Sequence, residues 1–232
     1  MLKRVIIIIT LAVGSTVLIT GNALTLTIDF RDPYYSEIAI KKEGSFRSDK
    51  DKLTLFALPS SSTDPPERYL TWYADDGIGV GGTSYEEDEV EWRELLEIVF
   101  DKSVKLSEIH LTDFFFEEER QGQSYEERGM VFFYDESKEE PLHATWFSQD
   151  DPDALPSPAS NGEYVIDVAS LIGADTLVKK ISLTGFGYIG SQDHEFSVAG
   201  LNVNPVPEPA TMLLLGSGLV GLAGFRRKFR KK

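Results

Sequence analysis

The sequence predicts an all-β fold, an antiparallel β-sandwich of the jelly-roll-like kind, flanked by a helix at each end of the chain. Apolar and polar residues alternate with a period of two in nine short segments, which is typical of half-buried strands. Clusters of Pro, Gly, Asn, Asp and Ser separate them, as at 59–66, 75–82 and 150–162. No long amphipathic helical pattern interrupts them, and strands at this spacing are typical of β-sandwiches.

The expected strands follow one another along the middle of the chain. The glycine-rich run 77–82 is expected to form a turn or loop between two of them. Residues 86–100 also fit a helical pattern, but we favour an acidic loop followed by a strand. The expected strands span residues 24–30, 52–58, 69–73, 94–100, 104–112, 130–134, 164–168, 180–186 and 196–203.

The charges of the 232-residue chain are unevenly distributed. The chain has 23 Lys and Arg against 38 Asp and Glu, which gives a net charge of −15. Residues 1–23 hold two of the basic residues and no acid, and residues 208–232 hold six basic residues and one acid. Residues 24–207 therefore keep 15 basic and 37 acidic residues, a charge near −22. Such a surface repels polyphosphate, which excludes nucleic acid as a partner.

The N-terminus has the pattern of a secretory signal peptide, residues 1–23. Lys3 and Arg4 form a charged start, and residues 5–19 form an uncharged apolar run. Small residues follow, so we expect cleavage between Ala23 and Leu24. The run is short for a membrane span, which needs about 20 residues. The alternative is an uncleaved signal anchor; either way, a β-sandwich domain is expected over residues 24–204.

The C-terminus, residues 205–232, has three parts in a fixed order. Pro207, Glu208 and Pro209 come first, and the prolines keep this segment extended. An apolar, glycine-containing stretch at about 210–225 follows, as membrane helices tolerate. The tail 226–232 should remain cytoplasmic because it is strongly basic. Its basic residues are Arg226, Arg227, Lys228, Arg230, Lys231 and Lys232.

These three parts together resemble the PEP-CTERM sorting signal of Gram-negative bacteria that secrete exopolysaccharide. The resemblance implies recognition by exosortase, a membrane protease-transpeptidase that acts near the motif. It also implies an inner-membrane-anchored precursor that is later transferred to the cell surface or the extracellular matrix. The alternative is an ordinary membrane anchor that is never processed. Residues 70–115 are similar to extracellular β-sandwich domains attached to such tails, most of which have no assigned activity.

Carboxylates are the main candidates for a binding site in the middle of the chain. Asp75, Asp76, Asp88 and Glu89 flank the glycine-rich run, and oxygen-rich loops can hold Ca²⁺ with 6–8 oxygen ligands. The alternative is a solvated acidic loop that keeps the protein soluble. No other cofactor is expected.

Catalytic signals are weak. The absence of cysteine excludes a disulfide scaffold, a cysteine metal site and a thiol nucleophile. No serine-hydrolase elbow or phosphate-binding loop occurs, and the three histidines are isolated in sequence. Among so many acids, spacing cannot single out a glycosidase pair. Five aromatic residues are candidates for stacking on sugars or for the core: Trp72, Tyr73, Trp92, Trp146 and Tyr188.

The leading hypothesis is a non-enzymatic, exported β-sandwich protein of the cell surface or exopolysaccharide matrix. Its expected partners are exosortase, the membrane before processing, and exopolysaccharide. The first alternative is a calcium- or carbohydrate-binding adhesion module. The second is a secreted glycoside hydrolase.

Overall fold

A computed structural model describes the β-domain of the chain. The described residues are 25–41, 43–60, 67–81, 89–90, 94–114, 118–120, 123–125, 128–137, 139–148, 162–185, 196–206 and 216–218. Their strands are β1 (Leu26–Asp29), β2 (Ser45–Ser48), β3 (Leu53–Pro59), β4 (Tyr69–Tyr73), β5 (Gly77–Gly81), β6 (Glu94–Thr112), β7 (Glu118–Arg120), β8 (Gln123–Tyr125), β9 (Arg128–Tyr134), β10 (His143–Ser148), β11 (Tyr164–Asp167), β12 (Val178–Gly185) and β13 (Ser197–Pro205). Their short helices are η1 (Pro33–Ser36), α1 (Glu37–Lys41) and α2 (Val168–Ile172).

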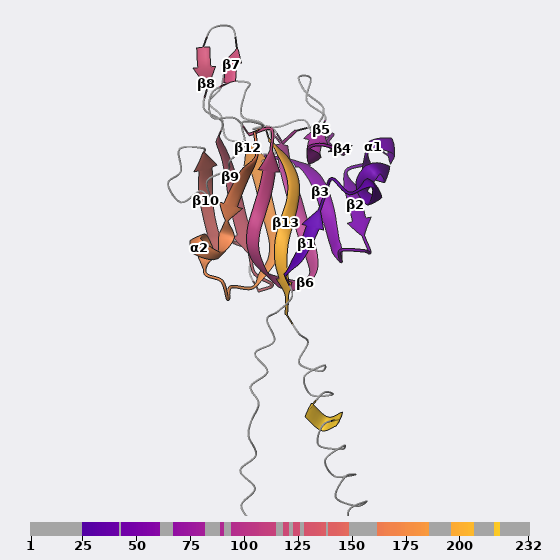
Figure 1. Ribbon diagram of the computed structural model, residues 1–232, viewed down its shortest axis with the longest axis vertical. Coiled ribbons are helices and arrows are strands. Elements are labelled where there is room, and N and C mark those ends of the chain that lie inside the picture. The colour runs from indigo at the N-terminus through magenta and orange to yellow at the C-terminus, as the bar shows by residue number, and fades with distance from the viewer. Residues whose placement is uncertain are drawn as a thin grey trace, which may run out of the picture.

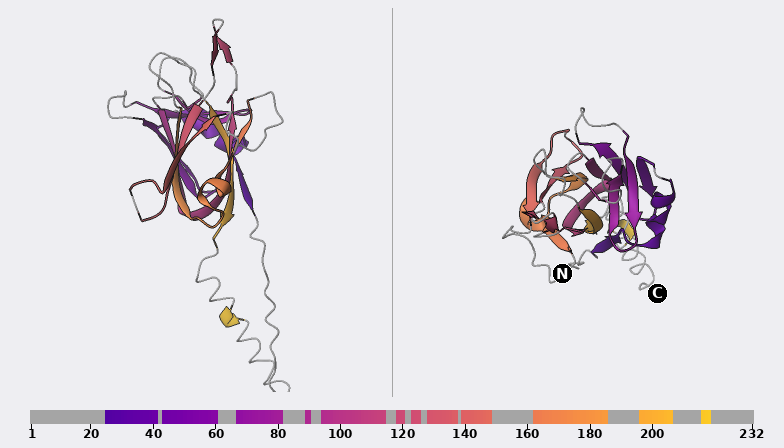
Figure 2. Two further views of the ribbon diagram at one scale, coloured as in Figure 1. Left: turned by 90° about the vertical axis from the view of Figure 1, so that its left-hand side faces the viewer. Right: turned by 90° about the horizontal axis from the view of Figure 1, so that it is seen from above.

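Eleven of these strands form one antiparallel sheet that folds into two facing layers (Figures 1 and 2). In the first layer the order is β2-β3-β6-β12-β9-β10. In the second layer the order is β11-β6-β13, with β1 and β5 beside β13 and β4 beside β5. β7 and β8 form a separate hairpin. The predicted antiparallel β-sandwich is confirmed.

β6 belongs to both layers. Its first part, residues 94–100, lies between β3 and β12, and its last part, residues 104–112, lies between β13 and β11. A straight strand of 19 residues would span roughly 60 Å at about 3.3 Å per residue, so β6 must bend to stay within the domain. The two layers therefore meet at this bend.

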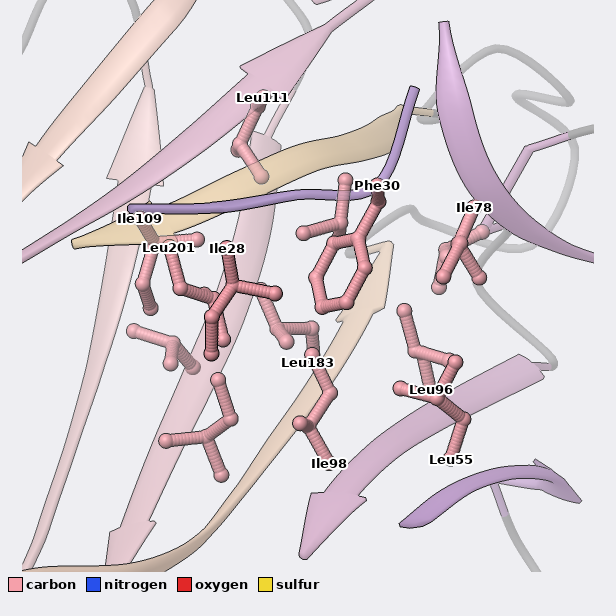
Figure 3. Close-up of a cluster of buried hydrophobic side chains, with 14 of the residues drawn as sticks. Ile28, Phe30, Leu55, Ile78, Leu96, Ile98, Ile109, Leu111, Leu183 and Leu201 are labelled. Carbon is pink, nitrogen blue, oxygen red and sulfur yellow. The ribbon is translucent and has the colours of Figure 1, made fainter. Parts of the chain in front are cut away.

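The core fills the space between the layers. Figure 3 shows Ile28 and Leu201 of the second layer on one side of the cluster and Ile98 and Leu183 of the first layer on the other. All four are at most 1% exposed. Complete burial of such a side chain stabilises a fold by roughly 1.5–3 kcal/mol. Every buried member of the cluster lies between residues 28 and 203, so the domain contains its own core.

A β-bulge sets which side chains of the second half of β6 face the core. Strict alternation after buried Leu106 would turn Glu108 inward. Instead the register with β13 shifts, so that Ser107 is the extra residue and Ile109 is buried. The Ser107 hydroxyl donates to the Asn202 carbonyl oxygen at 3.0 Å, which anchors the bulge.

The expected strands agree with this fold over most of their length. The strand predicted at 69–73 coincides with β4, and residues 94–100 form a strand and not a helix. The strands predicted at 94–100 and 104–112 are one continuous strand, β6. The edge strands β2 and β10 were not predicted, because each is covered on one side only and lacks a clean alternation.

The prediction of a turn or loop at 77–82 is wrong for its first five residues. Gly77–Gly81 is strand β5, which pairs with β4 and contacts β13, and the turn lies at 74–76. Gly77 has φ of +110°, and a Cβ there would collide with the Val198 carbonyl. The glycine therefore lets β5 pass close to β13.

The predicted terminal helices fall mainly outside the described residues. The signal peptide, residues 1–23, is outside them entirely, and of the expected membrane helix only residues 216–218 are described, in helical conformation. In the described parts of the chain, no helix has both the length and the apolar character needed to cross a bilayer.

A buried ion pair joins the starts of β4 and β6. Arg68 Nε lies 3.5 Å from Glu94 Oε1, and both side chains are 0% exposed. Burial of two charges is costly, and the removal of one partner leaves the other charge uncompensated. The pair therefore constrains how these two strands meet.

The bulge leads to a prediction about deletions in β6. Deletion of Ser107 should restore plain alternation from Leu106 to Ile109 and keep the fold, with a loss of about 1 kcal/mol for the hydrogen bond. Deletion of Val99, in the regular part of the ladder, should prevent folding because it reverses the faces of its neighbours. Circular dichroism and urea unfolding of both variants measure this difference; equal behaviour of the two variants would contradict it.

A second prediction concerns the buried ion pair. Glu94→Gln should lower the free energy of unfolding by about 3–5 kcal/mol, because Arg68 stays charged and buried. Asp101→Asn is the matched control, since its partner Arg47 is half exposed and such pairs contribute about 0–1 kcal/mol. Urea unfolding followed by tryptophan fluorescence compares the two variants. If both variants lose a similar free energy of unfolding, the buried pair contributes no more to stability than the exposed pair, which would contradict the prediction.

Candidate functional site

The two ends of the β-domain lie side by side. β1 begins the domain and pairs with β13, which ends it, with Leu26 opposite Val203. The Thr25 hydroxyl donates to Asn204 Oδ1 at 3.0 Å, which extends this contact. The first residue of β1 and the last residue of β13 therefore lie at the same end of the sandwich (Figure 1).

The folded domain continues almost to the Pro-Glu-Pro segment. Pro205, the last residue of β13, is still opposite Val104, and Pro207 follows two residues later. The predicted sorting residues Pro207, Glu208 and Pro209 are themselves outside the described residues, as are Ala23 and Leu24. So are the six basic residues of the tail 226–232.

The proposed calcium ligands that are described do not come together. Asp75 is exposed in the turn between β4 and β5, and the neighbouring Asp76 carbonyl accepts a 2.6 Å hydrogen bond from Thr112. The Val80 amide donates a hydrogen bond to the Glu89 carbonyl, so Glu89 lies beside Val80. The four strand residues from Asp76 to Val80 cover about 13 Å, which separates Glu89 from Asp76.

Asp88 is outside the described residues. Within the described ranges, no three His, Asp or Glu side chains converge as metal ligands would. The calcium site stays a prediction.

The outer side of the second layer is polar. His110 Nε2 lies 3.1 Å from Glu108 Oε2, and the Asn202 amide donates to the same carboxylate. The neighbouring Asp167 accepts from the amide and hydroxyl of Ser170 at 3.1 and 2.7 Å, at the start of α2. These groups bond with one another on an open sheet face. His143 lies on β10 of the first layer, and His194 is outside the described residues.

The candidate aromatic residues take different positions. Trp72 packs against the core and its Nε1 donates to the Phe30 carbonyl at 2.6 Å, whereas the adjacent Tyr73 is 46% exposed. Trp146 is 58% exposed on edge strand β10. Trp92 and Tyr188 are outside the described residues.

Trp146 belongs to a broad apolar surface on the outer side of the first layer. Strand register places Trp146 opposite Met130, whereas Val131, Phe133 and Phe147 on the other side of these strands are buried in the core. The same alternation continues across β12, β6 and β3. We call this surface the aromatic face. Its members are Trp146 on β10; Arg128, Met130, Phe132 and Tyr134 on β9; Lys180, Ser182 and Thr184 on β12; Leu95, Glu97 and Val99 on β6; and Thr54, Phe56 and Leu58 on β3.

The centre of the aromatic face is polar and internally bonded. Lys180 Nζ lies 2.6 Å from Glu97 Oε1 and 4.0 Å from the centre of the Tyr134 ring. The Ser182 hydroxyl donates to the same carboxylate oxygen at 3.0 Å. The only carboxylate among the members of the face is therefore ion-paired and hydrogen-bonded.

Sequence reasoning missed the aromatic face. The usable signal was residues 130–134, which we count among the alternating segments although they are apolar or aromatic at every position. Such a run indicates a strand with two apolar sides. Only one side of β9 faces the core, so the other side forms this surface.

A shallow cleft of about 360 Å³ lies beside α1 and β2. Its wall includes an ion pair between Glu37 and Lys41 at 3.0 Å, so part of its charge is neutralised internally. The cleft is lined by Tyr34, Glu37, Lys41, Glu43, Ser45, Phe46 and Arg47.

Comparison with known families accounts for the end of the chain. The family model described as "PEP-CTERM protein-sorting motif" matches residues 205–228. The chain carries a PEP-CTERM sorting motif. This motif implies an exported, membrane-anchored precursor of a Gram-negative bacterium that is processed by exosortase. No curated protein matches the chain significantly.

The match begins at the last residue of the sandwich. Residue 205 is both the end of β13 and the start of the matched segment. Among the described residues, the buried core runs from Ile28 to Val203 and therefore lies before the matched segment.

A pH-dependent contact holds η1 next to the cleft. The Asp32 carboxylate accepts from Lys50 Nζ at 2.6 Å and from the Tyr34 amide at 2.8 Å, and the hydrogen bond from Lys50 is the main cause of a lowered pKa of Asp32. The stabilisation of the folded domain by these Asp32 contacts is thus present at neutral pH. It is lost as the pH falls through the lowered pKa of Asp32.

Lys50→Met should raise the pKa of Asp32 toward its usual value of 3.8, without reaching it because the bond from Tyr34 remains. A carboxyl-detected NMR titration measures this shift. Lys52→Met, two residues away and exposed, is the control that should leave the pKa of Asp32 unchanged.

Proposed function

We propose that this protein is a non-enzymatic component of the cell surface or exopolysaccharide matrix, delivered there by exosortase processing. The observation that carries the proposal is the coincidence of the last strand with the start of the sorting motif. Cleavage near the motif would release a sandwich that keeps all of its core. Function would then reside in the surfaces of the sandwich.

The polar groups of the described residues favour a non-enzymatic role. Glu108 and Asp167 are opposite each other on neighbouring strands, where a hydrolase could place two carboxylates. Asp167 instead caps α2, and Glu108 bonds to Asn202 and His110 on an open face. General acid–base catalysis needs a carboxyl group that is available to the substrate and shielded from water.

The charge of the domain suits a hydrated matrix. Residues 24–207 carry a charge near −22, and a strong net charge favours solubility and the attraction of cations. The same charge disfavours attachment to anionic lipid after the basic tail has been removed. Release into the matrix is therefore preferred over a return to the membrane.

The test is to express the full chain in a matched host with and without exosortase and to measure its intact mass. With exosortase, the mass should fall by the loss of the residues after the cleavage point, and Glu208→Ala should keep the longer form. Glu139→Ala, an exposed acid in the β9–β10 loop, is the control and should be processed normally. An unchanged C-terminus with and without exosortase would refute the sorting role.

A screen of the exported protein against polysaccharide substrates tests the non-enzymatic part separately. We expect no release of reducing sugar. Turnover that is lost in Glu108→Gln would favour the hydrolase alternative.

A further inference from the structure

The two outer sides of the sandwich differ in chemistry although both are built from alternating strands. On the second layer, Asn202, Glu108 and His110 form a polar network, as expected for a side that faces water. On the first layer, Trp146 is 58% exposed and Phe132 and Phe56 are half-buried on the aromatic face. The register places Ser182 and Glu97 between Phe132 and Phe56, so these rings flank a polar centre. Exposed apolar surface combined with polar groups marks binding sites.

The aromatic face combines flat rings with fixed polar groups. Tyr134 lies under Lys180, whose ammonium group is held by Glu97. Ser182 is held by the same carboxylate. Because these groups fix one another, they are ordered before a ligand arrives, which lowers the cost of binding. Binding sites for uncharged polar ligands have this composition, with apolar rings and a few placed hydrogen-bonding groups.

Charge selects among the partners that could cover the aromatic face. A second copy would bring another charge near −22, and an anionic lipid or polyanion would meet the same repulsion. A cationic partner would be attracted to the acidic remainder of the surface, whereas the carboxylates on this side of β6, Glu97 and Asp101, are already paired with Lys180 and Arg47. The partner that fits is a neutral polymer with apolar ring faces and many hydroxyl groups.

We propose that the aromatic face binds an extended neutral polysaccharide, an inference that rests on the proposed matrix function. Sugar rings would stack by their C–H faces on Trp146, Phe132 and Phe56. Their hydroxyl groups would bond with Lys180 and Glu97 near the centre. The five strands from β10 to β3 span about 19 Å at about 4.8 Å per step, so the face accommodates several sugar units of one chain.

The experiment uses the full-length protein from a host without exosortase, purified in a mild detergent. Isothermal titration and affinity gel electrophoresis measure its binding to a neutral β-glucan, a galactomannan, alginate as a polyanion, and vesicles containing phosphatidylglycerol. We expect binding to a neutral polymer, and we expect Trp146→Ala to weaken it about tenfold or more, as for an aromatic anchor. Tyr73→Ala is the matched control, because Tyr73 is an exposed aromatic on β4, away from the face, and should leave affinity unchanged.

Phe132→Ser is a second variant on the aromatic face, and the melting temperature of every variant confirms folding. Neutral polymer bound equally by wild type, Trp146→Ala and Phe132→Ser would place the site elsewhere and overturn the proposal. Binding only to alginate or vesicles, or self-association abolished by Trp146→Ala, would also overturn it. If no polymer binds while exosortase still shortens the chain, this proposal fails and the sorting function stands.

Discussion

The rest of the structure depends on the shared strand β6. Because residues 94–100 belong to one layer and residues 104–112 to the other, one strand fixes the distance and the relative position of both layers. Its apolar residues reach the same core from two sides, and the bulge at Ser107 keeps Glu108 outside that core. A one-residue change of register would exchange core and solvent faces, so the strand is under a strict constraint.

The position of β13 links the fold to export. β13 lies between β6 on one side and β1 on the other, so the last strand is held by the first strand of the domain. The sorting motif begins at residue 205, where the pairing of β13 with β6 ends. Because β1 and β13 pair antiparallel, the start of β1 and the end of β13 lie at the same end of the sandwich (Figure 1).

The two outer sides of the sandwich differ in polarity. Polar residues that bond to one another, such as Glu108 and Asn202, need no partner beyond water. Rings such as Trp146 and Phe132 leave apolar surface exposed, which water solvates poorly. Residues 24–207 carry a charge near −22, and this aromatic side contrasts with the polar outer side of the second layer.

Local pattern determined the class of fold, most strands and the sorting signal. β4 was predicted with its observed bounds because its sequence alternates between two turns, and the sorting motif is defined by neighbours in sequence. Tertiary structure alone decided that residues 77–81 form a strand, in which β13 passes close to Gly77 and the Tyr69 ring of β4 lies against Gly81. It also decided that one strand serves both layers, and that side chains from five strands form the aromatic face. Alternation shows that a strand has two sides; which side is buried depends on the strands that pack against it, and these are distant in sequence.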